Sequence, residues 1–238
     1  MGTSRGKRRS RILLLDIETS PLVSYTWGLY ETNVIKKLKQ FTILSVAYQW
    51  LGEKTRVIAC DTVTERQLLT NLHALLSDAD IVIAHNGDSF DIKKINTRFI
   101  IHKIPPPSPY KTIDTKKVAK SVAAFDSNSL NNLGLDMSEG EKVKHRGFEM
   151  WEGCMAGNRA DWADMKRYNK KDVDLLTSIY LRLRPWMKSH PRTSEGSVCQ
   201  HCGSSKAKSR GFSLTVTGVK RRRLVCECGA WRTGEKVS

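Results

Sequence analysis

Four acidic side chains in three separate stretches are the residues best suited to chemistry in this sequence. Asp16 and Glu18 follow an apolar run, Asp91 comes after a second one, and Asp172 lies four residues beyond Tyr168. Carboxylates that converge in a protein interior repel one another unless a divalent cation lies among them. Convergence of these four would therefore create a metal site with oxygen ligands, which is suited to phosphate chemistry.

The first two carboxylates would be carried by a strand. Residues 12–16 form a short run of Ile and Leu, a pattern that predicts a strand buried on both faces. Alternate strand residues share a face, so Asp16 and Glu18 can bind one ion together. Two ions about 3.5–4 Å apart can activate water on one side of a phosphorus and stabilise the departing oxygen on the other. Asp91 and Asp172 would complete such a pair of sites.

Asp172 lies in the longest predicted helix, which runs from a capping Asp161 to about Arg184. The inward stripe of this helix, at intervals of three or four residues, consists of Trp162, Met165, Asn169, Asp172 and Leu176. Asp174 is rotated by about 200° from Asp172, because helical residues advance by about 100° each. The helix therefore favours Asp172 as the inward carboxylate and places Tyr168 one turn before it.

The other elements predict an α/β domain in which strands come first and then alternate with helices. A hairpin follows the first strand, a capping box at Thr64 and Gln67 opens a helix, and three prolines at 105–107 stop the next one. The predicted strands are residues 41–50, 55–59, 81–84 and 110–113, and the predicted helices are residues 64–77, 91–103 and 115–123.

Four cysteines cluster near the end of the chain in two tight pairs. Cys199 and Cys202 are separated from Cys226 and Cys228 by 23 residues that alternate like a β-hairpin around Gly218. Such spacing gives four tetrahedral thiolates, and the glycine after each pair permits the backbone to turn beneath a metal. We expect a zinc ribbon with one structural Zn2+; paired disulfides or incidental thiols are the alternatives.

The chain of 238 residues carries a formal net charge of +16, which attracts polyanions such as nucleic acid. Lys220, Arg221, Arg222 and Arg223 concentrate this charge and would bind phosphates without reading sequence; a solvated strand face is the alternative. No apolar run approaches the ~18 residues needed to cross a membrane. The first apolar run is also too short for a signal peptide, so we expect a soluble, cytoplasmic protein without a membrane partner.

Composition divides the chain into four parts. Residues 1–9 contain almost no apolar side chain and predict a flexible basic arm. Residues 10–188 would form the α/β domain, which is large enough to bury roughly 70% of its unfolded surface. Residues 189–197 lack apolar periodicity and predict a linker, and residues 198–238 would form the ribbon.

The ordered acidic motifs resemble those of a known family. The stretches Asp16-Ile17-Glu18-Thr19, Asn86-Gly87-Asp88-Ser89-Phe90-Asp91 and Tyr168-Asn169-Lys170-Lys171-Asp172 are similar to the three motifs of RNase H-like 3'-5' exonucleases with four metal-binding carboxylates. One branch of that family has histidine five residues before the last aspartate, where this chain has Arg167. The resemblance is therefore to the tyrosine branch. It spans residues 11–183 and points to stand-alone relatives of the proofreading domain of family B DNA polymerases.

This resemblance implies a mixed central sheet flanked by helices, with the site at the edge of the sheet. It also implies that the four carboxylates bind two Mg2+ or Mn2+ and that Tyr168 orients the attacking water. Thr19, Asn86 and Phe90 would hold the terminal nucleotide, although Phe90 can equally be a core residue that anchors its helix.

The activity expected from the resemblance is 3'-5' exonuclease action on nucleic acid, with single-stranded DNA ends favoured and nucleoside 5'-monophosphates released. RNA remains an alternative substrate, because the residues that would read the 2'-hydroxyl are not evident. A structure-specific endonuclease and a non-catalytic nucleic-acid-binding protein are the alternative functions. Replication or repair proteins are candidate partners.

Overall fold

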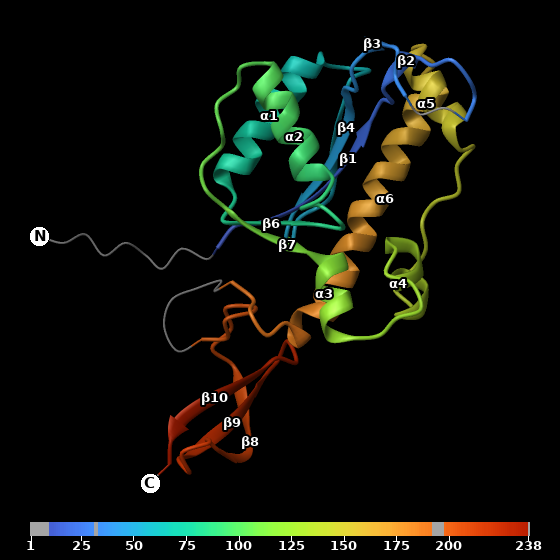
Figure 1. Cartoon of the computed structure of the whole chain (residues 1–238). Helices are drawn as coiled ribbons and strands as arrows, with labels where there is room; N and C mark the ends of the chain where they lie inside the picture. The colour runs from blue at the N-terminus through green and yellow to red at the C-terminus, as the bar shows by residue number, and fades with distance from the viewer. Residues whose placement is uncertain (1–9, 31–32, 192–197, 238) are drawn as a thin grey trace, which may run out of the picture.

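The computed structural model describes residues 10–30, 33–191 and 198–237, and its larger part is built on a five-stranded sheet (Figure 1). The strands lie in the order β5-β4-β1-β6-β7. Their bounds are β1 Ile12–Thr19, β4 Ile43–Trp50, β5 Arg56–Ala59, β6 Ile81–Ala84 and β7 Lys111–Asp114. β5, β4 and β1 pair antiparallel, whereas β1, β6 and β7 pair parallel. The sheet is therefore mixed, as the family resemblance implies.

β1 lies at the centre of the sheet, and both of its faces are covered. Leu13, Leu15 and Ile17 pack in the cluster that includes residues of α1 (Glu65–Asp78) and α2 (Asp91–Ile101). Ile12 and Leu14 face the other way, toward α6 (Arg159–Leu183). Full burial of one such side chain contributes about 1.5–3 kcal/mol, so the strand is held firmly between the two helical layers.

Shorter helices complete the α6 side of the sheet. They are α3 (Thr115–Val122), α4 (Leu130–Asp136), α5 (Phe148–Met155) and the 3-10 turn η1 (Arg184–Trp186). In Figure 1, α5 lies near the start of α6, and α3 and α4 lie toward its other end. None of the helices in the described part of the chain is both long and apolar enough to cross a membrane.

Several local predictions are confirmed and others are wrong. The capping box at Thr64 and Gln67 is present at the start of α1. β1 continues to Thr19 rather than ending at residue 16, because residues 17–19 keep pairing with β4. α6 begins after Asn158, whose side chain accepts two backbone N–H bonds; the predicted cap, Asp161, instead pairs with Arg146.

A small antiparallel hairpin and α5 were absent from the sequence prediction. The hairpin consists of β2 (Val23–Tyr25) and β3 (Lys36–Lys39), which follow β1 and precede β4 in the chain and form a separate two-stranded sheet. Both elements are short, and the side chains of β3 are all exposed, so neither has an apolar alternation that periodicity can detect.

The C-terminal part is a three-stranded antiparallel sheet in the order β10-β9-β8, one strand more than the predicted hairpin. Its strands are β8 (Ala207–Leu214), β9 (Lys220–Cys226) and β10 (Trp231–Lys236). It contacts the larger domain near the end of α6, where the His201 ring nitrogen Nε2 lies 3.0 Å from the carbonyl oxygen of Met187. The predicted arm, residues 1–9, and most of the predicted linker, residues 192–197, lie outside the described part of the chain.

Candidate metal centre and active site

Three of the four predicted carboxylates meet between β1 and α6. Asp16 and Glu18 project from the face of β1 that also carries Leu14, and Asp172 projects from α6 toward them. One carboxylate oxygen from each lies within 4.8 Å of the others. The preference for Asp172 over Asp174 agrees with this placement, since Asp174 instead accepts a hydrogen bond from Thr55.

Asp91, the fourth predicted ligand, lies beside this group rather than within it. It is the first residue of α2, and only 2% of it is exposed. Its Oδ1 accepts a hydrogen bond of 3.1 Å from the backbone N–H of Ile17, the residue of β1 between Asp16 and Glu18. This bond holds Asp91 against β1. Burial raises the pKa of Asp91 to about 7, although the Ile17 N–H opposes the shift.

The crowding of these acidic side chains raises their pKa values. Burial, followed by the charge of Asp172, raises the pKa of Glu18 to about 8. Burial and then the charge of Asp91 raise the pKa of Asp16 well above its ordinary value. Such shifts mean that ionisation of these carboxylates is unfavourable without a cation beside them. A bound divalent cation would favour the ionised form.

The donor set fits a divalent cation with oxygen ligands. All the converging atoms are carboxylate oxygens, which Mg2+ and Mn2+ prefer and which are poor ligands for softer metals. The Oδ1 atom of Asp172 is also buried without a hydrogen-bond partner among the described residues. A buried acceptor of this kind is costly unless something binds it, so this oxygen fits the role of a metal ligand.

Lys142 is a site residue that the sequence reasoning missed. Its Nζ donates to Asp172 Oδ2 at 2.5 Å and to the Tyr168 hydroxyl at 2.9 Å. Burial lowers the pKa of Lys142, but the charge and hydrogen bonds of Asp172 and Tyr168 together raise it overall. Lys142 lies outside helix and strand, so no periodicity marks it. In this structure its ammonium supplies the positive charge nearest to Asp172.

Because Lys142 and a divalent cation neutralise the same carboxylate, we expect them to compete for it. The variant Lys142→Met removes the ammonium and keeps the apolar stem, so its Mn2+ affinity should rise by about tenfold, equivalent to ~1.4 kcal/mol. Isothermal titration of Mn2+ into wild type and variant measures this difference. Lys144→Met, a nearby lysine with no contact to Asp172, serves as the control, and an affinity that falls in Lys142→Met alone would contradict the expectation.

Tyr168 lies on α6 one turn before Asp172, as the motif predicts. Its surroundings keep its hydroxyl protonated. Only 8% of the residue is exposed, and its ring packs edge-on against His145 and Trp151. Burial and then the charge of Asp172 raise its pKa to about 12. The hydroxyl therefore retains its proton at neutral pH and can act as a hydrogen-bond donor.

Asn169 holds one of the carboxylates in place. Its Nδ2 donates to Asp16 Oδ2 at 2.7 Å, and its Oδ1 accepts from Ser45 at 2.9 Å. The residue is completely buried. Its position on the inward stripe of the helix was a usable signal, because an amide on an otherwise apolar stripe must find polar partners.

The residues predicted to hold the terminal nucleotide are close to the carboxylates in the sequence. Thr19 ends β1, one residue after Glu18. Asn86 has a φ of +64°, and its backbone N–H donates to Asp114 Oδ1 at 2.9 Å; Gly87 follows, where a Cβ would lie 2.3 Å from that of Ala84. This tight turn sets the entry into α2. Phe90 is 40% exposed and outside the core clusters, so it is not a core anchor.

The four clustered cysteines also converge. The Sγ atoms of Cys199 and Cys228 are 3.7 Å apart, and those of Cys202 and Cys226 are 3.5 Å apart. Thiolates placed tetrahedrally at about 2.3 Å from a zinc ion would be about 3.8 Å from one another, so the cluster fits zinc. His201 is turned away toward Met187. Its side chain contributes to the contact between the two parts of the chain, and the four sulfurs would by themselves complete a closed shell around zinc.

The side chains of the basic run in the ribbon point to two opposite faces of the strand that carries it. Residues 220–223 lie in β9, where successive side chains point to opposite faces. Lys220 stacks over the ring of Phe212 and Arg223 over that of Trp231. Arg221 is half-buried, with its guanidinium near Gly234. The four charges therefore do not form one patch on one face, and each face carries two of them.

The comparisons with known proteins agree with this fold. The sequence profile of the RNase H superfamily matches residues 13–184, which is most of the chain, and the protein belongs to this superfamily. A search of curated proteins found no match.

A solved structure with the same fold is the family B DNA polymerase from the hyperthermophilic archaeon Pyrobaculum calidifontis. It aligns with a TM-score of 0.57 and 14% sequence identity, over 75% of this chain and 25% of the polymerase. The chain thus spans about a quarter of that enzyme. At this identity the similarity concerns the fold.

Proposed function

We propose that this protein is a metal-dependent 3'-5' exonuclease that removes nucleotides from the ends of nucleic acid, with single-stranded DNA favoured and nucleoside 5'-monophosphates released. The observation that carries the proposal is the meeting of Asp16, Glu18 and Asp172 between β1 and α6, with Asp91 beside them. Membership of the RNase H superfamily supports nuclease activity, and the polymerase neighbour supports DNA as the substrate.

Asp16, Glu18, Asp91 and Asp172 would hold two Mg2+ or Mn2+ ions. When bound, such ions make water a stronger nucleophile and neutralise charge on the phosphate. The polypeptide itself contributes positions rather than covalent chemistry. Asn169 orients Asp16, the Ile17 N–H orients Asp91, and Tyr168 presents a protonated hydroxyl that can align the attacking water.

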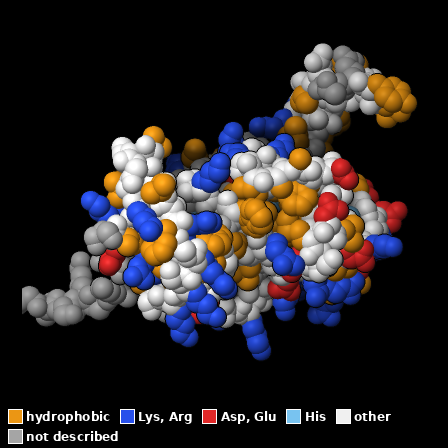
Figure 2. Space-filling model, turned by 90° about the horizontal axis from the view of Figure 1, so that it is seen from below, with side chains coloured by type: hydrophobic (Ala, Val, Ile, Leu, Met, Phe, Trp, Pro, Cys, Tyr) orange, Lys and Arg blue, Asp and Glu red, His pale blue; other side chains and the backbone are white. Residues whose placement is uncertain are grey.

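Substrate binding would involve two regions. Thr19, Asn86 and Phe90 would contact the terminal nucleotide, with the exposed ring of Phe90 available for stacking on a base. The ribbon would contact phosphates farther along the strand, because residues 191–238 carry ten Lys or Arg and three Asp or Glu. Figure 2 shows Lys and Arg side chains spread over the face seen from below, where the ribbon lies in Figure 1.

The proposal is tested with end-labelled DNA and RNA of the same sequence, in Mg2+ or Mn2+. We expect stepwise loss of mononucleotides from the 3' end, with DNA degraded faster than RNA. Internal fragments would indicate an endonuclease, and faster loss from RNA would reverse the substrate preference. If wild type and Asp16→Ala both bind the strand without cutting it in either metal, the protein is a non-catalytic binder.

Tyr168→Phe tests the role of the hydroxyl. The ring should keep its packing against His145 and Trp151, so we expect unchanged Mn2+ affinity and a kcat lowered by about 10- to 100-fold, at the lower end of typical proton-transfer and positioning effects. Single-turnover hydrolysis of a labelled strand and Mn2+ titration separate the two quantities. Equal turnover in the variant would show that the hydroxyl has no part in the reaction.

A further inference from the structure

The hairpin β2–β3 and the chain that joins its strands form an exposed arm (residues 22–39, of which 31 and 32 are not described). Most of its large hydrophobic side chains have no core to enter: Trp27 is 82% exposed, Leu29 96% and Tyr30 98%. The arm stands out from the body at the upper right of Figures 1 and 2, and hydrophobic side chains gather on it. Aromatic rings left in water in this way indicate a surface that binds something.

The arm begins next to the carboxylate cluster and is anchored there. Ser20, two residues after Glu18, donates its backbone N–H to the Thr42 carbonyl at 2.9 Å, and its hydroxyl accepts the backbone N–H of Thr42 at 2.8 Å. These bonds clamp the two ends of the arm together at the edge of β1 and β4. The arm therefore projects from a fixed base beside the proposed active site.

The strand register shows which side chains share a face of the arm. Tyr25 is opposite Lys36, Ser24 is opposite Lys37 and Val23 is opposite Lys39; the register shifts between Val23 and Ser24, where Leu38 is an extra residue on β3. Opposite residues in an antiparallel pair share a face, and residues two apart on one strand do so as well. Tyr25 and Lys36 therefore lie on the face that carries Val23 and Lys39, and Lys37 lies on the other.

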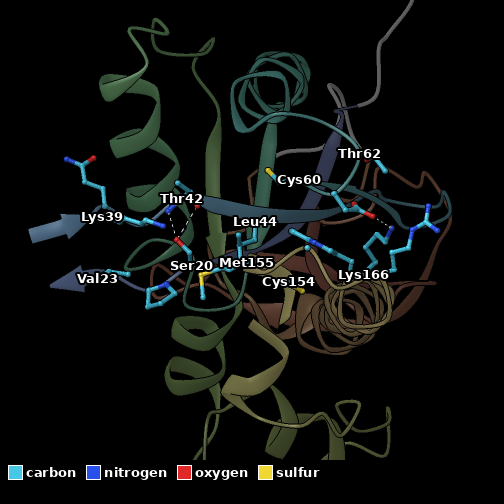
Figure 3. A pocket seen from close by; sticks show the side chains of 16 residues that line it. Ser20, Val23, Lys39, Thr42, Leu44, Cys60, Thr62, Cys154, Met155 and Lys166 are labelled. Atoms are coloured by element: carbon cyan, nitrogen blue, oxygen red, sulfur yellow. Dashed lines mark hydrogen bonds and ion pairs between the residues drawn. The ribbon is translucent and has the colours of Figure 1, made fainter. Parts of the chain in front are cut away.

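That face continues into a groove of about 890 Å³, lined by Val23 and Lys39 at one end and by Thr62 and Lys166 at the other (Figure 3). Ser20 and Leu44 also line it, so it begins at the strand ends that flank Glu18. The groove thus begins near the end of β1 that carries Glu18 and reaches Val23, which lies on the same face of β2 as Tyr25.

The charge of this surface suits a polyanion. Lys39, Arg159 and Lys166 line the groove, against one acidic side chain, Asp61, which pairs with Lys166 at 2.6 Å. The arm itself contains three lysines, and Glu31 is the single acidic residue of its sequence. Rings interleaved with cations are the combination that binds single strands without reading their sequence, by stacking on bases and pairing with phosphates.

We propose that the arm and the groove bind the single-stranded segment of the substrate that lies on the 5' side of the reacting end, with Tyr25 stacking on a base and Lys36 and Lys39 contacting phosphates. This inference rests on the proposed function, because a 3'-5' exonuclease must hold the rest of the strand on one side of its carboxylates. It assigns that side to β2–β3 and identifies the substrate as a strand unpaired over several nucleotides.

The test compares the two faces of the arm in the full-length chain. Tyr25→Ala/Lys36→Ala changes the groove face, and Ser24→Ala/Lys37→Ala removes the same charge from the opposite face. Fluorescence anisotropy measures their affinities for a single strand of about 20 nucleotides and for a trinucleotide, with Asp16→Asn in each protein to prevent cleavage. Because stacking on one base is worth about fivefold to a hundredfold in affinity, we expect at least a tenfold loss for the long strand in the groove-face variant.

The trinucleotide should bind all variants equally, and the opposite-face variant should lose less than about threefold for the long strand. Tyr25→Trp, which keeps a stacking ring, should bind like the parent protein and shows that the loss is not a folding defect. Equal losses from both faces, or no loss from either, would overturn the proposal. So would a dimer of the parent protein in light scattering that becomes monomeric in the groove-face variant with unchanged strand affinity, because the arm would then bind a second copy.

Hydrolysis by the protein with Asp16 intact separates this inference from the proposed function. A face-specific loss of binding in a protein that cuts no strand would remove the exonuclease proposal and keep the arm as a binding surface. Normal 3' hydrolysis together with unchanged binding by the groove-face variant would remove the arm alone.

Discussion

Asp16→Asn is expected to abolish hydrolysis while making the metal-free protein more resistant to heat. Residues that only support a metal ligand typically cost about 10- to 100-fold when replaced, so the loss of a ligand should exceed a hundredfold. Stability should rise because Asp16 is buried beside Asp91, Glu18 and Asp172, whose charges all raise its pKa. A neutral amide of the same shape removes that repulsion and can still accept a hydrogen bond from Asn169.

The two effects are measured on the same protein. Thermal unfolding without divalent ions should show a higher Tm for Asp16→Asn, by about 2–4 °C for each kcal/mol in a chain of this size. Addition of Mn2+ should then raise the Tm of wild type more than that of the variant. Asp174→Asn on the same region of α6 is the matched control and should keep its activity. A variant that cuts like wild type, or a metal-free Tm that falls, would contradict the role of Asp16.

Treatment with a zinc chelator is expected to unfold the ribbon and leave the larger domain folded, because the four cysteines are placed to bind zinc. The buried cluster of the ribbon consists of Cys199, Cys226 and Ala230, which cannot supply a hydrophobic core. Zinc binding contributes about 10–16 kcal/mol in small domains of this kind, so it is the main source of their folded state. By contrast, β1 lies between two helical layers with its Leu side chains fully buried.

Hydrogen exchange with mass spectrometry measures both regions before and after treatment with a zinc chelator. The amides of β8, β9 and β10 should lose protection, whereas those of β1 and β4 should keep it. Cys226→Ser should behave like the chelated protein and release its zinc to a colorimetric indicator, and Cys60→Ser, a cysteine outside the cluster, should keep one zinc per chain. Unchanged protection of β9 in the zinc-free protein would show that the ribbon needs no metal.

The strongest sequence predictions concerned features whose causes are local. The apolar run of β1, the capping box at Thr64 and the spacing of the four cysteines each depend on residues close together in the chain, and the structure contains all three features. Helical periodicity chose Asp172 over Asp174 for the same reason, because rotation along one helix follows from the sequence alone. The order of the acidic motifs indicated the superfamily.

Errors occurred where a local pattern had two possible partners. Asp161 is a good capping residue by type, but Asn158 caps α6 and leaves Asp161 to pair with Arg146. A side chain from elsewhere in the chain thus decided which polar group was used.

Sequence alone determined the type of site: which carboxylates point inward, where the cysteines pair and that the chain attracts polyanions. Only the tertiary structure decided what surrounds those groups. Lys142 reaches Asp172 from outside helix and strand, Asn169 aligns Asp16 across 153 residues, and the arm lies beside the groove through the pairing of β2 with β3. These contacts join segments that share no periodicity, and their geometry depends on packing of the whole domain, which no local pattern encodes.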